Sequence, residues 1–236
     1  MGSPTRFTSG VATVDAQYPL GNYPFPDPFH TSGQSGTGSV QYVNDFNTLI
    51  GTDYTVTGTS STFALTAGVG GLAILTPGGS TTASAAYKAV GFLQFTAGDK
   101  FWYVARVKAS AVSGNKAFYF GLRSGSSAND GIWFAKAAAS TSLNLVSTVG
   151  SAATTLVTGV ATVAADTYVD VAFYYDGTDL LVYSNDAVVA RVSAPTIGSS
   201  GTTLTDAVIG PVFQMTPTAT DTLTVDYVLA AQEVTR

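Results

Sequence analysis

The strongest structural signal in the chain is Tyr168-Val-Asp-Val-Ala-Phe-Tyr-Tyr175, which is followed by Asp176-Gly177 and by Leu180 to Ser184. Apolar residues recur along both runs, which are bounded by turn residues as strands are. Asp-Gly is favoured where a turn needs a positive φ, so the stretch predicts a β-hairpin. Asn185-Asp186 and Val188 to Val192 then extend the hairpin into a meander.

A second run, Phe101 to Lys108, alternates in the same way and divides its side chains between two faces. One face holds Phe101, Tyr103, Ala105 and Val107, and the other holds Trp102, Val104, Arg106 and Lys108. Further strands are predicted at Ala117 to Arg123, Ile132 to Lys136, Leu143 to Val149, Thr154 to Val163, Val208 to Met215 and Thr222 to Leu229. The one helical turn that the sequence suggests is Ala83 to Val90. Many short strands with Gly/Ser/Thr turns predict an all-β fold, an antiparallel β-sandwich or jelly roll, over residues 41–236.

Residues 1–40 differ from the rest and are predicted to form an extended N-terminal arm that ends in a Gly/Ser linker. Five of the nine prolines fall in the first 28 residues, and proline excludes helices and central strands. Ser32 to Ser39 has the composition of a flexible linker. The arm is nevertheless rich in aromatic residues, which disordered tails lack. We therefore expect it to lie along a partner protein; the alternative is that it folds back onto its own domain.

Few residues in this chain could carry out chemistry. There is no cysteine, His30 is the one histidine, Glu233 is the one glutamate, and charged residues make up 11%. Because enzymes need clustered titratable groups, the sequence predicts a structural or binding protein and not an enzyme, with no catalytic residue, metal site or cofactor. A net charge of −5 without a Lys/Arg cluster argues against nucleic acid as a partner. No run of 18 apolar residues is present, so no membrane span is expected.

Two groups of residues are candidate sites, each with a simpler structural explanation. Asp170, Asp176, Asp179 and Asp186 gather around the hairpin and could bind calcium, but aspartate is also an ordinary turn residue. Trp102 and Trp133 could form a sugar-stacking surface or belong to the core. A hydrolase that works with two carboxylates is disfavoured because only one glutamate is present.

Two stretches resemble known families. The arm, Arg6-Phe-Thr-Ser-Gly-Val-Ala-Thr-Val14 with Pro19-Leu-Gly-Asn-Tyr-Pro-Phe-Pro-Asp-Pro28, His30-Thr31 and Tyr42-Val-Asn-Asp-Phe46, resembles the start of a family of tailed-bacteriophage virion proteins. The hairpin Val169 to Tyr183 and the ending Leu223-Thr-Val-Asp-Tyr-Val-Leu229 resemble paired strands of concanavalin A-like (laminin G-like) sandwiches.

The resemblance implies a capsid decoration (cement) protein, made in the host cytoplasm and placed on the outer surface of the virion. Its partner would be the major capsid protein, and the chain would form a homo-oligomer, with a trimer favoured. The residues expected to contact capsid subunits or neighbouring copies are Arg6, Phe7, Leu20, Tyr23, Phe25, Phe29 and His30. Two alternatives stay open: a carbohydrate-binding or adhesion module that binds a glycan through Trp102 or Trp133, and a tail or baseplate component.

Overall fold

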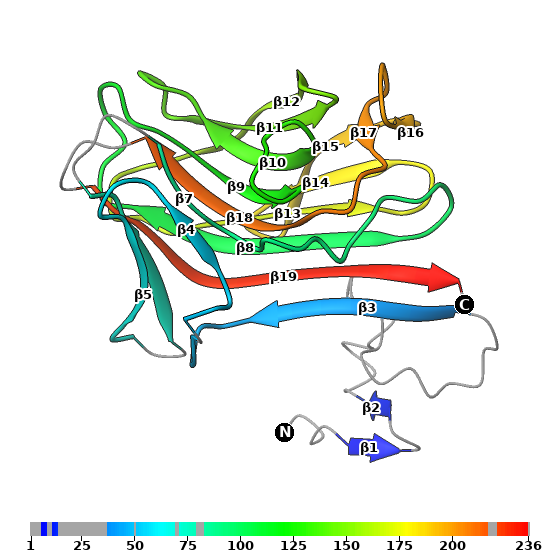
Figure 1. Cartoon of the computed structure of the whole chain (residues 1–236). Coiled ribbons are helices and arrows are strands. Elements are labelled where there is room, and N and C mark those ends of the chain that lie inside the picture. Colours follow the sequence, from blue (N-terminus) through cyan, green and yellow to red (C-terminus); the bar gives the residue numbers. More distant parts are fainter. Residues whose placement is uncertain are drawn as a thin grey trace.

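The computed structural model describes residues 6–8, 11–13, 37–49, 51–68, 71–78, 83–216 and 221–235. Every helix or strand element in these residues is a β-strand, as the alternating sequence pattern predicts. Figure 1 shows two sheets stacked face to face. Both are antiparallel, so the predicted all-β sandwich is confirmed. The described residues include no helix that is long and apolar enough to cross a membrane.

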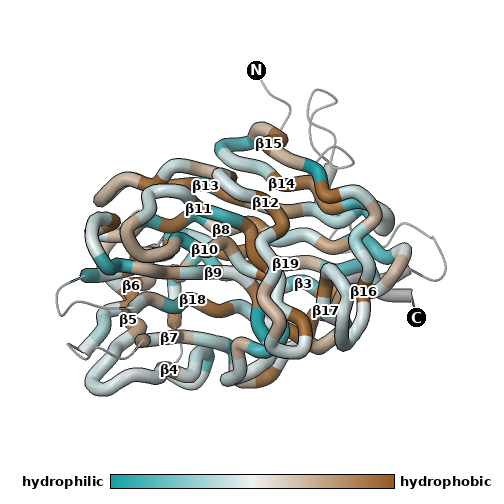
Figure 2. The backbone as a smooth tube through the Cα atoms, turned by 90° about the horizontal axis from the view of Figure 1, so that it is seen from above, coloured by the Kyte–Doolittle hydropathy of each residue, from teal (hydrophilic) through white to brown (hydrophobic). Residues whose placement is uncertain are grey.

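The first sheet has seven strands in the order β12-β11-β10-β9-β18-β7-β4, which lie side by side when seen from above (Figure 2). Their order is far from sequential, because β18 from near the end of the chain is inserted between β9 and β7. The strands are β4 (Thr55–Thr57), β7 (Ser84–Tyr87), β9 (Ala117–Arg123), β10 (Gly131–Lys136), β11 (Ser142–Val149), β12 (Ala152–Thr162) and β18 (Gly210–Thr216).

The second sheet has eight strands in the order β15-β14-β13-β8-β19-β6-β5, and β3 pairs beside the second half of β19. The strands are β3 (Thr37–Asn44), β5 (Thr62–Thr66), β6 (Leu72–Thr76), β8 (Phe101–Ala109), β13 (Val169–Tyr175), β14 (Leu180–Ser184), β15 (Ala187–Val192) and β19 (Leu223–Thr235). Two small pairs complete the description: β1 (Arg6–Thr8) with β2 (Val11–Thr13), and β16 (Ile197–Gly198) with β17 (Leu204–Thr205).

The core lies between the two sheets and is built largely from aromatic rings. Phe173 of β13 stacks on Tyr103 of β8 with ring centroids 5.2 Å apart, and Phe134 of the facing sheet packs against both. Tyr103 is completely buried and its hydroxyl has no hydrogen-bond partner, so burial raises its pKa well above the usual value. The predicted inward face of β8 is confirmed, since Phe101, Tyr103, Ala105 and Val107 are all buried.

The prediction of a helical turn at Ala83 to Val90 is wrong. Residues Ser84 to Tyr87 form β7, which pairs with β18 on one side and β4 on the other. Alanine favours helices, but pairing on both sides and burial of Ala86 in the core outweigh that preference.

The turns of the meander differ from one another. Asn185 and Asp186 both have positive φ, 48° and 63°, as a two-residue hairpin turn requires. The turn at Asp176-Gly177 is longer, since the Asp176 carboxylate accepts hydrogen bonds from the backbone N–H groups of Thr178 and Asp179. At the other end of the domain, β3 begins at Thr37, so it overlaps the last residues of the predicted linker.

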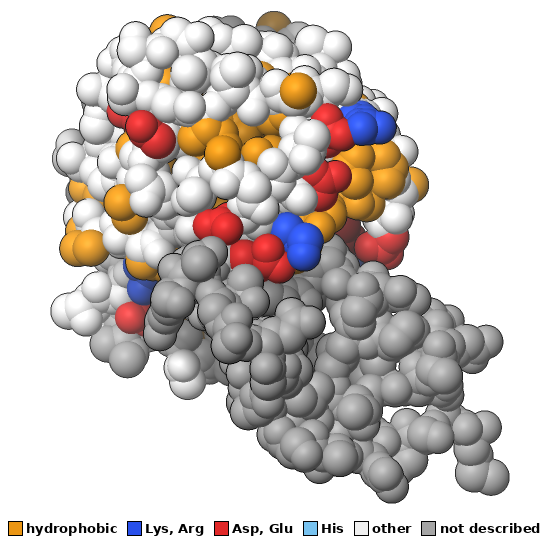
Figure 3. Space-filling view, turned by 90° about the vertical axis from the view of Figure 1, so that its right-hand side faces the viewer, with side chains coloured by type: hydrophobic (Ala, Val, Ile, Leu, Met, Phe, Trp, Pro, Cys, Tyr) orange, Lys and Arg blue, Asp and Glu red, His pale blue; other side chains and the backbone are white. Residues whose placement is uncertain are grey.

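Charged side chains are sparse on the surface. Figure 3 shows one face on which they stand singly or in small groups among uncharged polar and hydrophobic side chains. Ion pairs among the described residues include Arg106 with Asp226 at 2.8 Å and Lys100 with Glu233 at 3.0 Å. Most of the face shown therefore presents uncharged polar and apolar groups.

Candidate functional site

The outer face of the seven-stranded sheet places large aromatic side chains beside very small ones. Along β9, Tyr119, Gly121 and Arg123 point away from the core, because the residues between them point into it. Gly121 pairs with Trp133 of β10, and a Cβ at Gly121 would lie only 2.5 Å from the Trp133 Cα. The glycine therefore allows Trp133 to stack on Tyr119, with ring centroids 5.1 Å apart.

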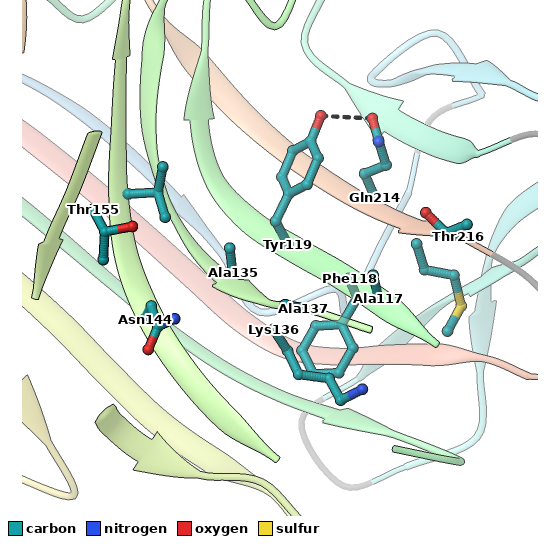
Figure 4. Close-up of a pocket in the computed structure, with 12 residues that line it drawn as sticks. Ala117, Phe118, Tyr119, Ala135, Lys136, Ala137, Asn144, Thr155, Gln214 and Thr216 are labelled. Carbon is teal, nitrogen blue, oxygen red and sulfur yellow. Dashed lines mark hydrogen bonds between the residues drawn. The ribbon is translucent and has the colours of Figure 1, made fainter. Parts of the chain in front are cut away.

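A hollow of about 300 Å³ lies beside Tyr119 on this face. Its floor is low because Ala117, Ala135 and Ala137 have small side chains. Figure 4 shows polar side chains on both sides of it: Asn144 and Thr155 on one side, and Tyr119, Gln214 and Thr216 on the other. The lining residues are Ala117, Phe118, Tyr119, Ala135, Lys136, Ala137, Asn144, Val146, Thr155, Gln214, Met215 and Thr216.

A buried arginine orients the wall on the Tyr119 side. Arg123 Nη1 donates to the Tyr119 hydroxyl at 2.9 Å and to Gln214 Oε1 at 3.2 Å, and the Tyr119 hydroxyl donates to Gln214 Oε1 at 2.6 Å. Arginine has no acceptor, so the tyrosine hydrogen must go to Gln214, and this fixes the glutamine with its Nε2 donors left for other partners. Burial raises the pKa of Tyr119, and the adjacent Arg123 guanidinium opposes part of that rise.

Arg123 is itself held from two further directions. Its Nε donates to the Gly125 carbonyl at 3.1 Å, and its guanidinium lies 4.7 Å from the centre of the Tyr87 ring. Only 4% of Arg123 is exposed. Arg123 is thus a fixed support for Tyr119 and Gln214.

Asn144 holds the opposite wall. Its Oδ1 accepts from the Gly159 N–H at 2.9 Å and from the Ser142 hydroxyl at 3.2 Å. The pairing of β11 with β12 is irregular at this point, so Asn144 anchors the irregular part of β12. With Oδ1 occupied, the Nδ2 group carries the remaining donors, and Figure 4 shows it turned toward the hollow.

The hollow therefore offers amide donors, hydroxyl groups and apolar patches, with little charge. Lys136 lines it, but its side chain is buried, and its Nζ donates to the Lys116 carbonyl. Burial, and then the charge of Lys116, lower the pKa of Lys136. None of the lining residues in the described part of the chain is a carboxylate. The arrangement suits a neutral, hydroxyl-rich ligand.

The two tryptophans proposed for sugar contact lie on opposite sides of the sandwich. Trp133 is next to the hollow, behind Tyr119, and is 7% exposed. Trp102 lies on the outer face of the other sheet, where it stacks on Tyr174 with centroids 5.1 Å apart. The two residues therefore cannot contribute to one site.

Five of the seven residues predicted to contact the capsid lie outside the described residues. Arg6 and Phe7 belong to β1, of which the backbone pairing with β2 is described. The remaining five, Leu20, Tyr23, Phe25, Phe29 and His30, are outside the described ranges.

Three of the four aspartates considered for calcium, Asp170, Asp176 and Asp179, accept hydrogen bonds from donors of the protein. Asp179 accepts from the Ala194 N–H and from Arg191, and these two interactions lower its pKa in that order. Asp170 accepts from the Tyr227 hydroxyl at 3.0 Å. Within the described ranges, no group of three or more His, Asp or Glu side chains is placed to hold a metal ion.

Comparison with known proteins places the fold among concanavalin A-like jelly rolls. An endo-1,3-beta-glucanase from Streptomyces sioyaensis superposes with a TM-score of 0.59 at 12% identity, over 86% of this chain and 98% of that one. A native glycosidic hydrolase gives 0.58 at 13% identity, over 80% and 94%. A protein of unknown function from Shewanella oneidensis MR-1 gives 0.57 at 14% identity, over 83% and 87%. No protein-family model and no curated protein matches the sequence.

These comparisons correct one expectation from the sequence. The prediction that the chain is not an enzyme is contradicted, because several structures with this fold are enzymes that act on glycans: a glycosidic hydrolase, several glucanases and a transglycosylase. The concanavalin A-like part of the resemblance is confirmed as a fold, and none of these structures points to a phage capsid.

The sequence analysis missed the residues that line the hollow. Alternation along Ala117 to Arg123 does place Tyr119 and Arg123 on one face, so this part of the signal was available. Gln214 joins them only because β18, about 90 residues further on, pairs with β9. No local pattern in the sequence indicates that pairing.

Proposed function

We propose that this protein is a glycan-binding β-sandwich and that its sugar site is the hollow beside Tyr119. The observation that carries the proposal is the chemistry of the lining: an aromatic wall, small apolar residues on the floor, and oriented amide and hydroxyl groups on both sides. Sugars present hydroxyl groups around an apolar C–H surface, and this lining complements both features.

The ligand class follows from the charge of the site. A carboxylate would repel anionic sugars and an exposed cation would attract them, and the lining exposes neither. We therefore infer a neutral oligosaccharide. Two proteins of similar structure are an endo-1,3-beta-glucanase and a beta-1,3-1,4-glucanase, which makes β-1,3- and mixed β-1,3-1,4-glucans the first ligands to test here.

The small volume of the hollow determines the affinity that we expect for an oligosaccharide. A volume of about 300 Å³ is at the lower limit of ligand sites. A shallow site of this size favours dissociation constants on the order of 0.1 to 1 mM, or about −5.5 to −4 kcal/mol. Titration calorimetry or NMR at high ligand concentration is the appropriate measurement.

Two neighbouring threonines of β12 provide a matched test. Thr155 pairs with Val146 and lines the hollow, whereas Thr154 pairs with the inward-facing Ser147. Thr155→Val should weaken binding of the best glucan oligosaccharide by about threefold to tenfold, since a hydrogen bond contributes about 1 kcal/mol. Thr154→Val should leave the affinity unchanged. Equal effects of the two substitutions, or no binding of any oligosaccharide by the wild-type protein, would refute the proposal.

The same samples should be analysed for cleavage. Chromatography of the glucans after prolonged incubation detects shortened products, which would make the chain a glycoside hydrolase and not only a binding protein. The comparison structures make this assay necessary.

Placement on a virion stays a prediction from the arm sequence, with the major capsid protein as partner and Arg6, Phe7, Leu20, Tyr23, Phe25, Phe29 and His30 as contacts. Attachment through many copies would strengthen weak glycan binding by multivalency. Quantitative mass spectrometry of purified particles from the source tests it. A ratio to the major capsid protein near one, or a simple fraction, supports a decoration protein, a few copies per particle indicate a tail component, and absence contradicts virion placement.

A further inference from the structure

A band of apolar side chains crosses the outer face of the eight-stranded sheet. Its members lie in register on six successive strands, β3, β19, β8, β13, β14 and β15. The band consists of Val43, Leu229, Val104, Ala172, Tyr183 and Val188. Its two ends are open, since Val43 is 64% and Val188 is 56% exposed. A continuous apolar row on a surface marks an interaction site.

The neighbouring row on the same face contains a second sign of a missing partner. Trp102 pairs with Ala231 and with Tyr174, and its indole stacks on the Tyr174 ring. Only 5% of Trp102 is exposed, and its Nε1 has no hydrogen-bond acceptor. A buried N–H donor of tryptophan usually finds a partner. A segment that brought a carbonyl oxygen to this position would complete the site.

We propose that this band, together with Trp102, is the docking surface for the Tyr18 to Phe29 segment of the same chain. This segment contains Tyr18, Leu20, Tyr23, Phe25 and Phe29, and its one charged residue is Asp27. The occupant thus matches an uncharged, apolar surface. Proline also prevents the segment from joining a sheet edge by regular pairing, and a proline-rich sequence favours a polyproline conformation, in which carbonyl oxygens are free to accept from Trp102.

The start of β3 lies close enough to Trp102 for the Tyr18 to Phe29 segment to reach the band. Residues 14–36 precede Thr37, which pairs with Thr235, and Gln41 four residues later pairs with Ala231 in the Trp102 row. From Thr37, Trp102 is therefore about 13 Å away along the strand direction and two strand spacings, of about 4.8 Å each, away across the sheet. About five extended residues span this distance. The band spans five spacings, about 24 Å, and the twelve residues of the segment extend about 37 Å as polyproline helix.

The size of the surface favours a peptide segment over a second copy. Two rows of side chains about 24 Å long cover a few hundred Å², whereas a stable dimer needs about 800 Å² from each partner. A tethered segment also has an effective concentration on the order of millimolar, so modest contacts keep it bound. This occupant differs from the capsid partner predicted from the arm, and it is independent of the glycan site on the other sheet.

The two tryptophans make the test specific, because each reports on one sheet. In full-length protein carrying Trp133→Phe, the remaining emission comes from Trp102. Tyr23→Ser, Phe25→Ser and Phe29→Ser are then introduced together. We expect the Trp102 emission to shift to the red and its quenching by acrylamide to increase relative to the Trp133→Phe parent protein. The matched control carries Trp102→Phe instead, and emission from Trp133 should not respond to the same three substitutions.

Three results would overturn the proposal. One is an unchanged Trp102 emission in the triple variant. Another is an equal change at Trp133, which would mean that the substitutions perturb the whole domain. The third is quenching that depends on protein concentration over about a hundredfold range, since mass action would then identify a second copy as the occupant.

Discussion

Arg123→Met is the substitution that tests most directly how the candidate site is built. It removes three hydrogen bonds, to Tyr119, Gln214 and Gly125, and the contact with the Tyr87 ring. Each hydrogen bond from the charged guanidinium contributes about 2 kcal/mol net, and the cation–π contact contributes about 1 kcal/mol. Tyr119 and Gln214 stay bonded to each other, so neither is orphaned. Methionine also avoids the cost of burying a guanidinium, which is about 4 kcal/mol. The expected loss of unfolding free energy is about 3 kcal/mol.

Thermal unfolding followed by circular dichroism measures this effect. For a chain of this length, about 3 kcal/mol corresponds to a fall in Tm of about 6 to 12 °C. Arg123→Lys is the informative comparison, because lysine keeps the charge but lacks the planar guanidinium that donates to three acceptors at once. The Tm of Arg123→Lys should therefore lie between the Tm of the wild-type protein and that of Arg123→Met. Glucan affinity should fall in both variants, because Tyr119 and Gln214 lose their support. A fall in Tm below about 2 °C for Arg123→Met would refute the argument.

Three further predictions concern other parts of the structure. Asn144→Ala should destabilise the irregular part of β12. The Gly159 amide should therefore exchange with deuterium faster than in the wild-type protein, while the exchange rates of amides in β13 do not change. An unchanged exchange rate at Gly159 would contradict the role of Asn144. Gly121→Ala should lower stability by about 1 to 3 kcal/mol in chemical denaturation, because the added Cβ would lie 2.4 Å from the Ile132 carbonyl oxygen; an unchanged midpoint would contradict it. The third prediction is alkaline instability. Burial, followed by nearby carboxylates, raises the pKa of Tyr174 and of Tyr227 to about 12, whereas tyrosine in the unfolded chain loses its proton near pH 10. The unfolded state thus binds fewer protons between these values, and stability should fall as pH rises from about 10 to 12. Tyrosinate absorbance should appear together with unfolding, and titration of most tyrosines near pH 10 in folded protein would contradict it.

Local patterns in the sequence predicted the strands well where one face is buried. The alternation in Phe101 to Lys108 correctly assigned both faces of β8, because the core side of this strand is uniformly apolar. The prediction of a helical turn at Ala83 to Val90 was wrong because the small residues Ser84, Ala85 and Ala86 give no clear hydrophobic periodicity. Pairing with β18 and β4 determined their conformation. The pairing itself, with β18 between β9 and β7, depends on contacts far apart in the sequence.

The candidate site was less predictable than the fold. Trp133 was singled out for its type and does lie beside the hollow, whereas Trp102 belongs to the opposite sheet. Tyr119 shares the outward face of β9 with Arg123, but Gln214 and Asn144 reach the hollow from β18 and β11. A site made by several strands becomes visible only when their order in the sheet is known.

Chemical-shift mapping on the full chain tests the central claim most directly. Isotope-labelled protein is titrated with a β-1,3-glucan oligosaccharide and, in parallel, with a mixed β-1,3-1,4-glucan oligosaccharide. The account predicts saturable shifts concentrated at the hollow, on residues such as Tyr119, Asn144, Thr155 and Gln214, with none around Trp102. Shifts confined to the eight-stranded sheet, or no saturable shift with any neutral glycan, would contradict it.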